Sequence, residues 1–306
     1  MLADGNIGGM RTRLLCIALA IVLASGSGAK AQTPEKLPVV ATFSILADFV
    51  RNVGGARVGV TALVGPDGDT HIYQPTPEDA ERLGAARLIV VNGLGLEGWI
   101  DRLIKTSSAK ASVIVAAKGL KPQQMREEGR IESDPHAWQS IAGAKLYVKN
   151  ILDGLIAADP EGESTYRSNA KDYLAKLDAL EEEVLAAIGN IPPERRQIIT
   201  THDAFGYFGS AYGFRFIAPE GISTETEPSA RDVAKIIRQI KAAKIPAVFL
   251  ENIADPRLMK QIAAETGAKI GGALFSDALS PPDGPAATYI DMMRYNVSQL
   301  SAALAQ

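Results

Sequence analysis

The sequence predicts an α/β protein with two similar α/β lobes, each built on a mostly parallel sheet, joined by one long rigid backbone helix. Short runs rich in β-branched residues alternate with amphipathic helical patterns in the first half of the chain, and the alternation returns in the second half. Between the halves, residues 163–188 carry apolar side chains at three- and four-residue spacing. At about 1.5 Å per residue this helix would be roughly 40 Å long, which suits a stiff connection.

Residues 1–31 have the pattern of a secretory signal peptide. Two arginines precede an apolar run at residues 14–24, and small residues lead to an Ala29-Lys30-Ala31 cleavage site. The run is shorter than the roughly 20 residues that span a bilayer. Cys16 could suggest a lipid anchor, but it stands at the start of the apolar run and not after it. We therefore expect cleavage before Gln32 and export to the periplasm.

Composition narrows the class of partner. The chain has a net charge of −3, and because the signal contains three cations and one anion, residues 32–306 have a net charge of −5. Mild acidity disfavours nucleic acid and suits cations. Cys16 is the only cysteine, so the exported chain has no disulfide, which a protein with a large core does not need. We expect a soluble monomer that does not bind nucleic acid.

The N-terminal lobe is predicted at residues 32–160. Its helices are expected at residues 45–53, 77–83 and 141–157, with proline entering and glycine ending the second of them. Residues 123–132 contain a cluster of charges and are expected to form an exposed loop. The strands of this lobe are expected at residues 38–43, 58–64, 88–91 and 111–115.

The linking helix is assigned to residues 161–190 and the C-terminal lobe to residues 191–306. Pro192-Pro193 forbids continuation of the long helix. The second lobe repeats the alternation of the first. Its strands are expected at residues 197–200, 248–251 and 269–274, and its helices at residues 229–242, 255–266 and 285–304.

The three histidines of the chain share one structural context. His71, His136 and His202 each follow a predicted strand or lie in a loop. Ligands of open α/β sheets bind beyond the carboxyl ends of strands, so three such loops can converge on one cleft. A single loop histidine is more often a bystander than a ligand. Three in the same context favour a metal site, because imidazole is the commonest transition-metal ligand.

A carboxylate would complete such a site. Three imidazoles and one carboxylate form a closed four-coordinate shell. Asp277, after the strand at residues 269–274, is the best fourth ligand, and Glu251 is the competitor. Asp69, Asp134 and Asp203 stand beside the histidines and could orient their rings.

Five motifs in this order resemble the metal-binding solute receptors of zinc- and manganese-type ABC importers, over essentially the whole chain after the signal. They are Asp69-Thr70-His71-Ile72-Tyr73-Gln74-Pro75-Thr76-Pro77, Asn92-Gly93-Leu94-Gly95-Leu96-Glu97-Gly98-Trp99, Asp134-Pro135-His136-Ala137-Trp138, Thr201-His202-Asp203-Ala204-Phe205-Gly206-Tyr207-Phe208 and Phe275-Ser276-Asp277-Ala278-Leu279. The resemblance implies two lobes around a buried metal. It also implies His71, His136, His202 and Asp277 as ligands, and a membrane permease as partner.

Two departures from the family pattern bear on the site. Thr70 stands where the family usually has proline, which affects the rigidity of the loop and not His71 itself. Many zinc-specific relatives have a histidine-rich loop where residues 123–132 stand here, and these residues include no histidine. An accessory zinc-collecting loop is therefore not expected.

The donor set favours Zn²⁺, with Mn²⁺ a close second. A third imidazole and the general affinity order both favour zinc, whereas Asp277 could give manganese a fifth contact by binding through both oxygens. In the family, histidine at the third position accompanies zinc and mixed-metal members. We therefore expect a receptor that delivers a divalent metal to an ABC permease, with no catalytic residues. The alternatives are a zinc-dependent hydrolase with a three-histidine site and a metal-independent adhesin on the same scaffold.

Overall fold

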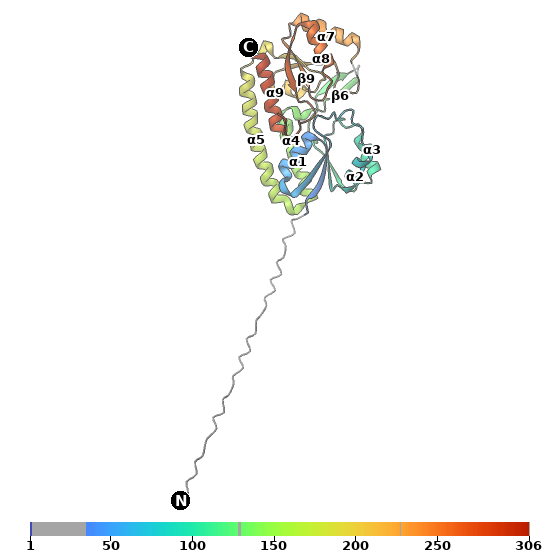
Figure 1. Cartoon of the computed structure of the whole chain (residues 1–306), viewed down its shortest axis with the longest axis vertical. Coiled ribbons are helices and arrows are strands. Elements are labelled where there is room, and N and C mark those ends of the chain that lie inside the picture. Colours follow the sequence, from blue (N-terminus) through green and yellow to red (C-terminus); the bar gives the residue numbers. More distant parts are fainter. Residues whose placement is uncertain (2–34, 128–129, 227, 306) are drawn as a thin grey trace. The chain divides into compact units, whose positions relative to one another are not determined.

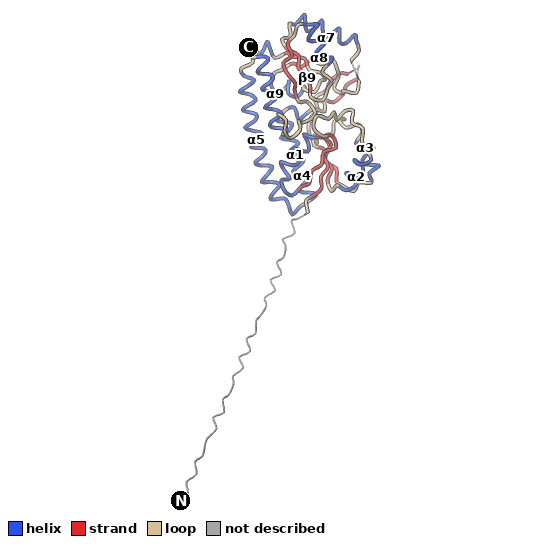
Figure 2. Tube along the Cα trace, in the orientation of Figure 1, coloured by secondary structure: helices blue, strands red, loops and turns tan. Residues whose placement is uncertain are grey.

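The computed structural model describes residues 1, 35–127, 130–226 and 228–305. Residues 35–306 form one compact unit. Its strands lie in two groups with helices around them, as Figure 2 shows. The predicted signal peptide and its cleavage site lie outside the described residues. In the part that is described, no helix has the length and apolarity needed to cross a membrane.

The first half of the unit is built on a parallel sheet of four strands. The strand order is β2-β1-β3-β4, and every neighbouring pair is parallel. The strands are β1 (Leu37–Phe43), β2 (Val58–Val64), β3 (Leu88–Val91) and β4 (Ser112–Val115). All four were predicted from the sequence to within one residue. Parallel strands point their carboxyl ends in one direction, so the loops that follow β1, β2 and β3 share one edge of the sheet.

Four helices accompany this sheet. They are α1 (Ser44–Gly54), α2 (Pro77–Ala85), α3 (Ile100–Ser107) and α4 (Ile141–Ala158). The start of α2 is a capping box, in which Thr76 and Asp79 satisfy each other's backbone N–H groups, with Pro77 at the first helical position. The sequence did not predict α3, whose eight residues are too few to show a clear helical period.

The long helix is present as predicted. It is α5 (Glu163–Gly189), and its buried side chains recur every three or four residues. Figure 1 shows α5 running beside α9 (Tyr289–Leu304), and α5 also packs against α1 and α4. Its buried residues are Tyr166, Ala170, Tyr173, Leu177, Leu180, Val184 and Ile188. A single apolar stripe therefore contacts helices from both halves.

The second half repeats the first with a sheet of order β10-β9-β7-β8, again parallel throughout. Its strands are β7 (Gln197–Ile199), β8 (Arg215–Ile217), β9 (Ala247–Glu251) and β10 (Lys269–Leu274). Its remaining helices are α6 (Gly206–Tyr212), α7 (Ala230–Ala243) and α8 (Arg257–Thr266). Val39 of the first sheet, Leu177 of α5 and Leu274 of the second sheet belong to one continuous apolar core.

Two sequence predictions are corrected. Residues 123–132 were expected as a loop, but β5 (Gln124–Glu127) pairs antiparallel with β6 (Arg130–Ser133). Met125 and Ile131 are the single apolar residues of these two strands, so the stretch carries too little apolar pattern for strands to be recognised from the sequence. The last helix starts at Tyr289 after its cap Thr288, and not at residue 285. The short elements α6 and β8 were not predicted. The lobe boundaries at residues 160 and 190 remain predictions.

Candidate metal centre

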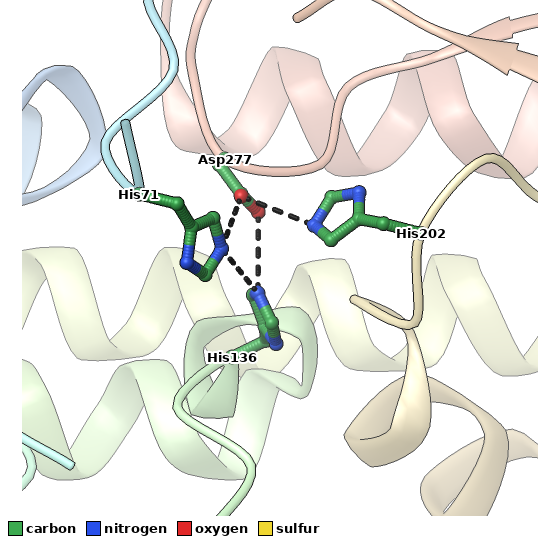
Figure 3. A group of neighbouring side chains, drawn as sticks. All are labelled: His71, His136, His202 and Asp277. Carbon is green, nitrogen blue, oxygen red and sulfur yellow. Dashed lines mark hydrogen bonds and ion pairs between the residues drawn. The ribbon is translucent and has the colours of Figure 1, made fainter. Parts of the chain in front are cut away.

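The four side chains singled out in the sequence meet at one place. His71 lies in the loop between β2 and α2, and His136 lies three residues after the end of β6. His202 lies three residues after β7, and Asp277 three residues after β10. Figure 3 shows all four pointing toward a common centre. The two sheets and the hairpin each supply ligand-type atoms from the segments that follow their strands.

The ligand-type atoms of these four residues lie within 4.8 Å of one another. Oδ2 of Asp277 is 3.2 Å from Nε2 of His71 and 3.2 Å from Nε2 of His202. Oδ1 of Asp277 is 3.7 Å from Nε2 of His136. Nε2 of His71 and Nε2 of His136 are 3.2 Å apart. Three imidazole nitrogens and both carboxylate oxygens therefore face one small volume.

The centre is buried and strongly coupled electrostatically. His136, His202 and Asp277 are fully buried, and His71 is 7% exposed. Burial opposes ionisation of Asp277, yet the charges of His202 and His136 hold the pKa of its carboxyl well below the ordinary value. Burial also opposes charging of His202, but Glu251 and Asp277 outweigh it and raise the pKa of this imidazole well above its ordinary value. A carboxylate in such surroundings requires positive charge beside it.

Asp134 orients the ring of His136. Its Oδ1 lies 2.8 Å from Nδ1 of His136 and also accepts the backbone N–H of His136 at 2.9 Å. With the proton on Nδ1, Nε2 presents its lone pair to the centre. Gly206 packs against this carboxylate, and a Cβ at that position would lie 2.5 Å from Oδ2 of Asp134. Only glycine fits there without displacing the group that holds His136.

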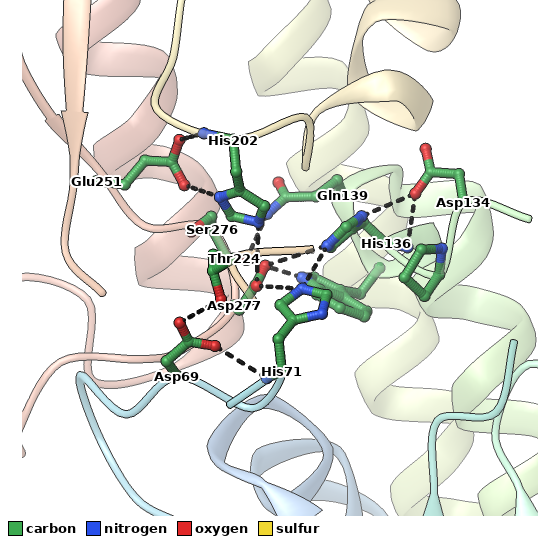
Figure 4. A network of polar contacts seen from close by, with 12 residues as sticks. Asp69, His71, Asp134, His136, Gln139, His202, Thr224, Glu251, Ser276 and Asp277 are labelled. Atoms are coloured by element: carbon green, nitrogen blue, oxygen red, sulfur yellow. Dashed lines mark hydrogen bonds and ion pairs between the residues drawn. The ribbon is translucent and has the colours of Figure 1, made fainter. Parts of the chain in front are cut away.

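Glu251 orients His202. Its Oε2 is 2.6 Å from Nδ1 of His202, and its Oε1 accepts the backbone N–H groups of Thr201 and His202 at 2.7 and 3.0 Å. Glu251 therefore faces the side of the ring away from the centre and is not in the group of four (Figure 4). Asp203, which the sequence suggested for this role, is paired through its backbone to Gly221. Burial raises the pKa of Asp203 to about 6.

The loop of His71 is held mainly through its backbone. Oδ1 of Asp69 accepts the N–H of His71 at 2.9 Å, and Trp99 Nε1 donates to the carbonyl of Thr70 at 2.9 Å. Thr224, from the second half of the chain, donates its hydroxyl to Oδ2 of Asp69 at 2.6 Å. Asp69 thus links the His71 loop to the other half, a role different from the ring orientation expected from the sequence.

The second sequence motif supports His136 indirectly. Asn92 donates its side-chain amide to the carbonyl of Pro135 at 3.0 Å, directly before His136. Glu97 accepts the backbone N–H of Asn92 at 2.6 Å and the hydroxyl of Thr42 at 2.6 Å. Burial raises the pKa of Glu97 although these hydrogen bonds act in the opposite direction. The motif therefore positions a loop and contributes no atom to the centre.

The chain matches a family of known proteins over most of its length. Residues 39–303 match the family described as the periplasmic component A of the zinc-uptake complex. The chain is 33% identical to the manganese-binding lipoprotein MntA of Halalkalibacterium halodurans, over 95% of this chain and 97% of that protein. It is 34% identical to the iron-binding protein YfeA of Yersinia pestis, over 90% of this chain and 88% of that protein.

Solved structures show the same relationship. The periplasmic zinc-binding protein TroA of Treponema pallidum superposes with a TM-score of 0.84 at 32% identity, covering 89% of this chain and all of that chain. This fold, with two parallel sheets and a long helix, is therefore shared with a solved metal-binding protein. Together with the family match over residues 39–303, it identifies the chain as a member of the periplasmic metal-binding, substrate-binding proteins of ABC importers.

Proposed function

We propose that this protein captures Zn²⁺ in the periplasm, with Mn²⁺ as second ion, and delivers it to the permease of an ABC importer. His71, His136, His202 and Asp277 are the proposed ligands. The observation that carries the proposal is the convergence of these four buried side chains from loops far apart in the sequence, with ligand-type atoms within 4.8 Å of one another.

The spacing of the donor atoms supports a transition metal. Bonds of about 2.0 to 2.1 Å at tetrahedral angles separate neighbouring donors by roughly 3.3 Å. The distances from Oδ2 of Asp277 to His71 and His202, and the distance between His71 and His136, are each 3.2 Å. No hydrogen-bond donor from the described residues, other than these imidazoles, reaches the oxygens of Asp277. A divalent cation would satisfy all of these groups at once.

The identity of the ion rests on the donor set. The relatives are named for manganese, iron and zinc, so the family alone does not select among them. Three nitrogen donors and one carboxylate favour Zn²⁺ over Mn²⁺ in the general affinity order. A hydrolase would need an open coordination position for water. Four protein ligands fill a tetrahedral shell, so we propose binding without catalysis.

Metal analysis of the protein purified without chelator tests the proposal. We expect about one equivalent of divalent metal, because four ligands form a single closed site. In a competition titration, Zn²⁺ should displace Mn²⁺. Protein that takes up neither ion in the titration would refute the proposal, and stronger binding of Mn²⁺ would refute the assignment of the ion.

Replacing Glu251 by glutamine should weaken metal binding by about 10- to 100-fold, the range found when the group that orients a metal-bound histidine is lost. A neutral amide no longer fixes the proton of His202 on Nδ1, so Nε2 is less available to the metal. Titration against a chelator of known affinity measures the effect. Unchanged affinity would show that the contact of 2.6 Å between Glu251 and His202 has no part in binding.

Metal affinity should fall as the pH falls. Because the pKa of His202 is raised above its ordinary 6.5, a proton occupies this ring in the metal-free protein above that pH, and the metal must displace it. The decline should therefore begin above pH 6.5, because each proton bound to this ring must be released before the metal can bind. Calorimetry at several pH values, in two buffers of different ionisation heat, measures affinity and proton release. Affinity independent of pH would contradict the prediction.

The same protonation has the opposite effect on the metal-free fold. The stability that charged His202 contributes is fully present below pH 6.5 and is lost as the pH rises through its raised pKa. The unfolding temperatures of the metal-free and the zinc-bound protein should therefore move apart as the pH rises. Zinc binding strengthens over this range, while the metal-free protein loses the stability that charged His202 contributes.

Export by a cleaved signal predicts a defined N-terminus. Protein recovered from the periplasm should begin at Gln32, because the Ala29-Lys30-Ala31 sequence fits signal peptidase. Intact mass measurement distinguishes this product from a chain that begins at Cys16 and has a lipid attached. Recovery of the lipidated form in the membrane fraction would show that Cys16 anchors the protein, as in relatives named lipoproteins.

A further inference from the structure

Two side chains from the turn after His136 donate to one backbone carbonyl on the other half of the protein. Trp138 Nε1 lies 2.9 Å from the carbonyl oxygen of Ser276, and Gln139 Nε2 lies 2.6 Å from the same oxygen. Because Ser276 directly precedes Asp277, these bonds fix the peptide from which the carboxylate extends. Figure 4 shows Gln139 and Ser276 beside the cluster of proposed ligands.

The buried amide of Gln139 lowers the stability of the fold. The side chain is fully buried, and its Oε1 has no hydrogen-bond partner among the residues that the structure describes. Only the NH₂ group can donate to a carbonyl, so the chemistry fixes the orientation of the amide. A buried oxygen without a partner is destabilising, whereas leucine or methionine would fill a similar volume without that penalty. What glutamine supplies here is the second donor to Ser276.

The carboxylate held in this way presents both of its oxygens to the centre. Oδ2 of Asp277 faces His71 and His202, while Oδ1 faces His136. With three imidazole nitrogens, a cation could therefore contact five donor atoms. Mn²⁺ prefers oxygen donors and higher coordination numbers, whereas Zn²⁺ is satisfied by four donors in a tetrahedron.

We infer that Gln139 is a positioning residue that holds Asp277 with both oxygens toward the cation and thereby narrows the preference for Zn²⁺ over Mn²⁺. The inference rests on the proposed function. Without the bond from Gln139, the peptide of Ser276 keeps only Trp138 as donor, and the carboxylate can rotate to bind through one oxygen. Zinc keeps four donors after this change. Manganese loses one of the oxygen contacts on which its binding depends.

The test compares Gln139→Leu with the unaltered protein. For Gln139→Leu we expect Mn²⁺ affinity to fall by roughly 10- to 100-fold, and Zn²⁺ affinity to change by less than about threefold. Cobalt gives an independent readout, because the visible absorption of Co²⁺ intensifies when its coordination number falls from five to four. The Co²⁺ form of the variant should therefore absorb more strongly. Gln139→Met, which also lacks a donor and is unbranched, serves if the leucine variant fails to fold.

Asn150→Leu is the matched control. Asn150 donates its amide to the carbonyls of Ala116 and Lys118 at 2.7 and 2.9 Å, away from the centre, so its loss should affect stability alone. Equal loss of both ions in the Gln139 variants, or an unchanged cobalt spectrum, would overturn the inference while leaving the proposed function intact. If the unaltered protein binds neither Zn²⁺ nor Mn²⁺, the proposed function itself fails.

Discussion

Replacing His202 by alanine should weaken zinc binding by more than the roughly 100-fold that loss of an orienting partner costs. The substitution removes one of three nitrogen donors and leaves Glu251 without the ring that it contacts at 2.6 Å. Competition with a chelator of known affinity measures the change, and unchanged affinity would remove His202 from the proposed ligand set.

A double-mutant cycle supplies the control for this prediction. If Glu251 acts through His202, then Glu251→Gln should add little further loss of affinity in the His202→Ala background. Additive effects would mean that Glu251 influences the metal by another route. The metal-free variants should also be compared by thermal unfolding, since an unpaired buried carboxylate destabilises the fold. This comparison separates loss of a ligand from loss of structure.

Replacing Asp277 by asparagine should have an effect of similar size, larger for Mn²⁺ than for Zn²⁺. Asp277 is the one anionic group among the four proposed ligands, and both of its oxygens face the imidazoles. A neutral amide offers one oxygen and no charge, and manganese depends on oxygen donors more than zinc does. The thermal stabilisation by each ion should shrink accordingly, because a ligand stabilises in proportion to the logarithm of its concentration over its dissociation constant.

Glu183→Gln makes the same change of charge away from the centre. Glu183 is about half exposed and pairs with Arg294 on the surface between α5 and α9. We expect this variant to bind both ions as the unaltered protein does. A comparable loss of affinity in Glu183→Gln would show that net charge, and not coordination by Asp277, controls binding.

Much of the fold and the residues of the centre could be predicted because each depends on local patterns. The sheet strands of the first half are apolar runs bounded by turn signals, and α5 shows its period over seven turns of sequence. His71, His202 and Asp277 could be placed near one another because strand ends converge in parallel sheets. The ligand roles themselves remain predictions that the substitutions above will test.

Other parts depend on contacts between distant segments, which the sequence does not display. Glu251 orients His202 because β9 lies beside β7 in the sheet, and strand order cannot be derived from spacing alone. The contact of Gln139 with Ser276 joins residues 137 positions apart. Short elements such as β8, with three residues, carry too little pattern to predict.

The shared core limits how the proposed metal site can open. Side chains of the first sheet, of α5 and of the second sheet form one continuous apolar cluster. Swinging one half away from the other would expose part of that cluster to water, at a cost proportional to the area uncovered. Lifting the His71 loop, by contrast, breaks the hydrogen bonds that hold it, among them those from Thr224 to Asp69 and from Trp99 to Thr70, and removes one proposed ligand from the metal. Movement of the His71 loop therefore uncovers less apolar surface than separation of the two halves, and we expect it to be the movement that opens the proposed metal site.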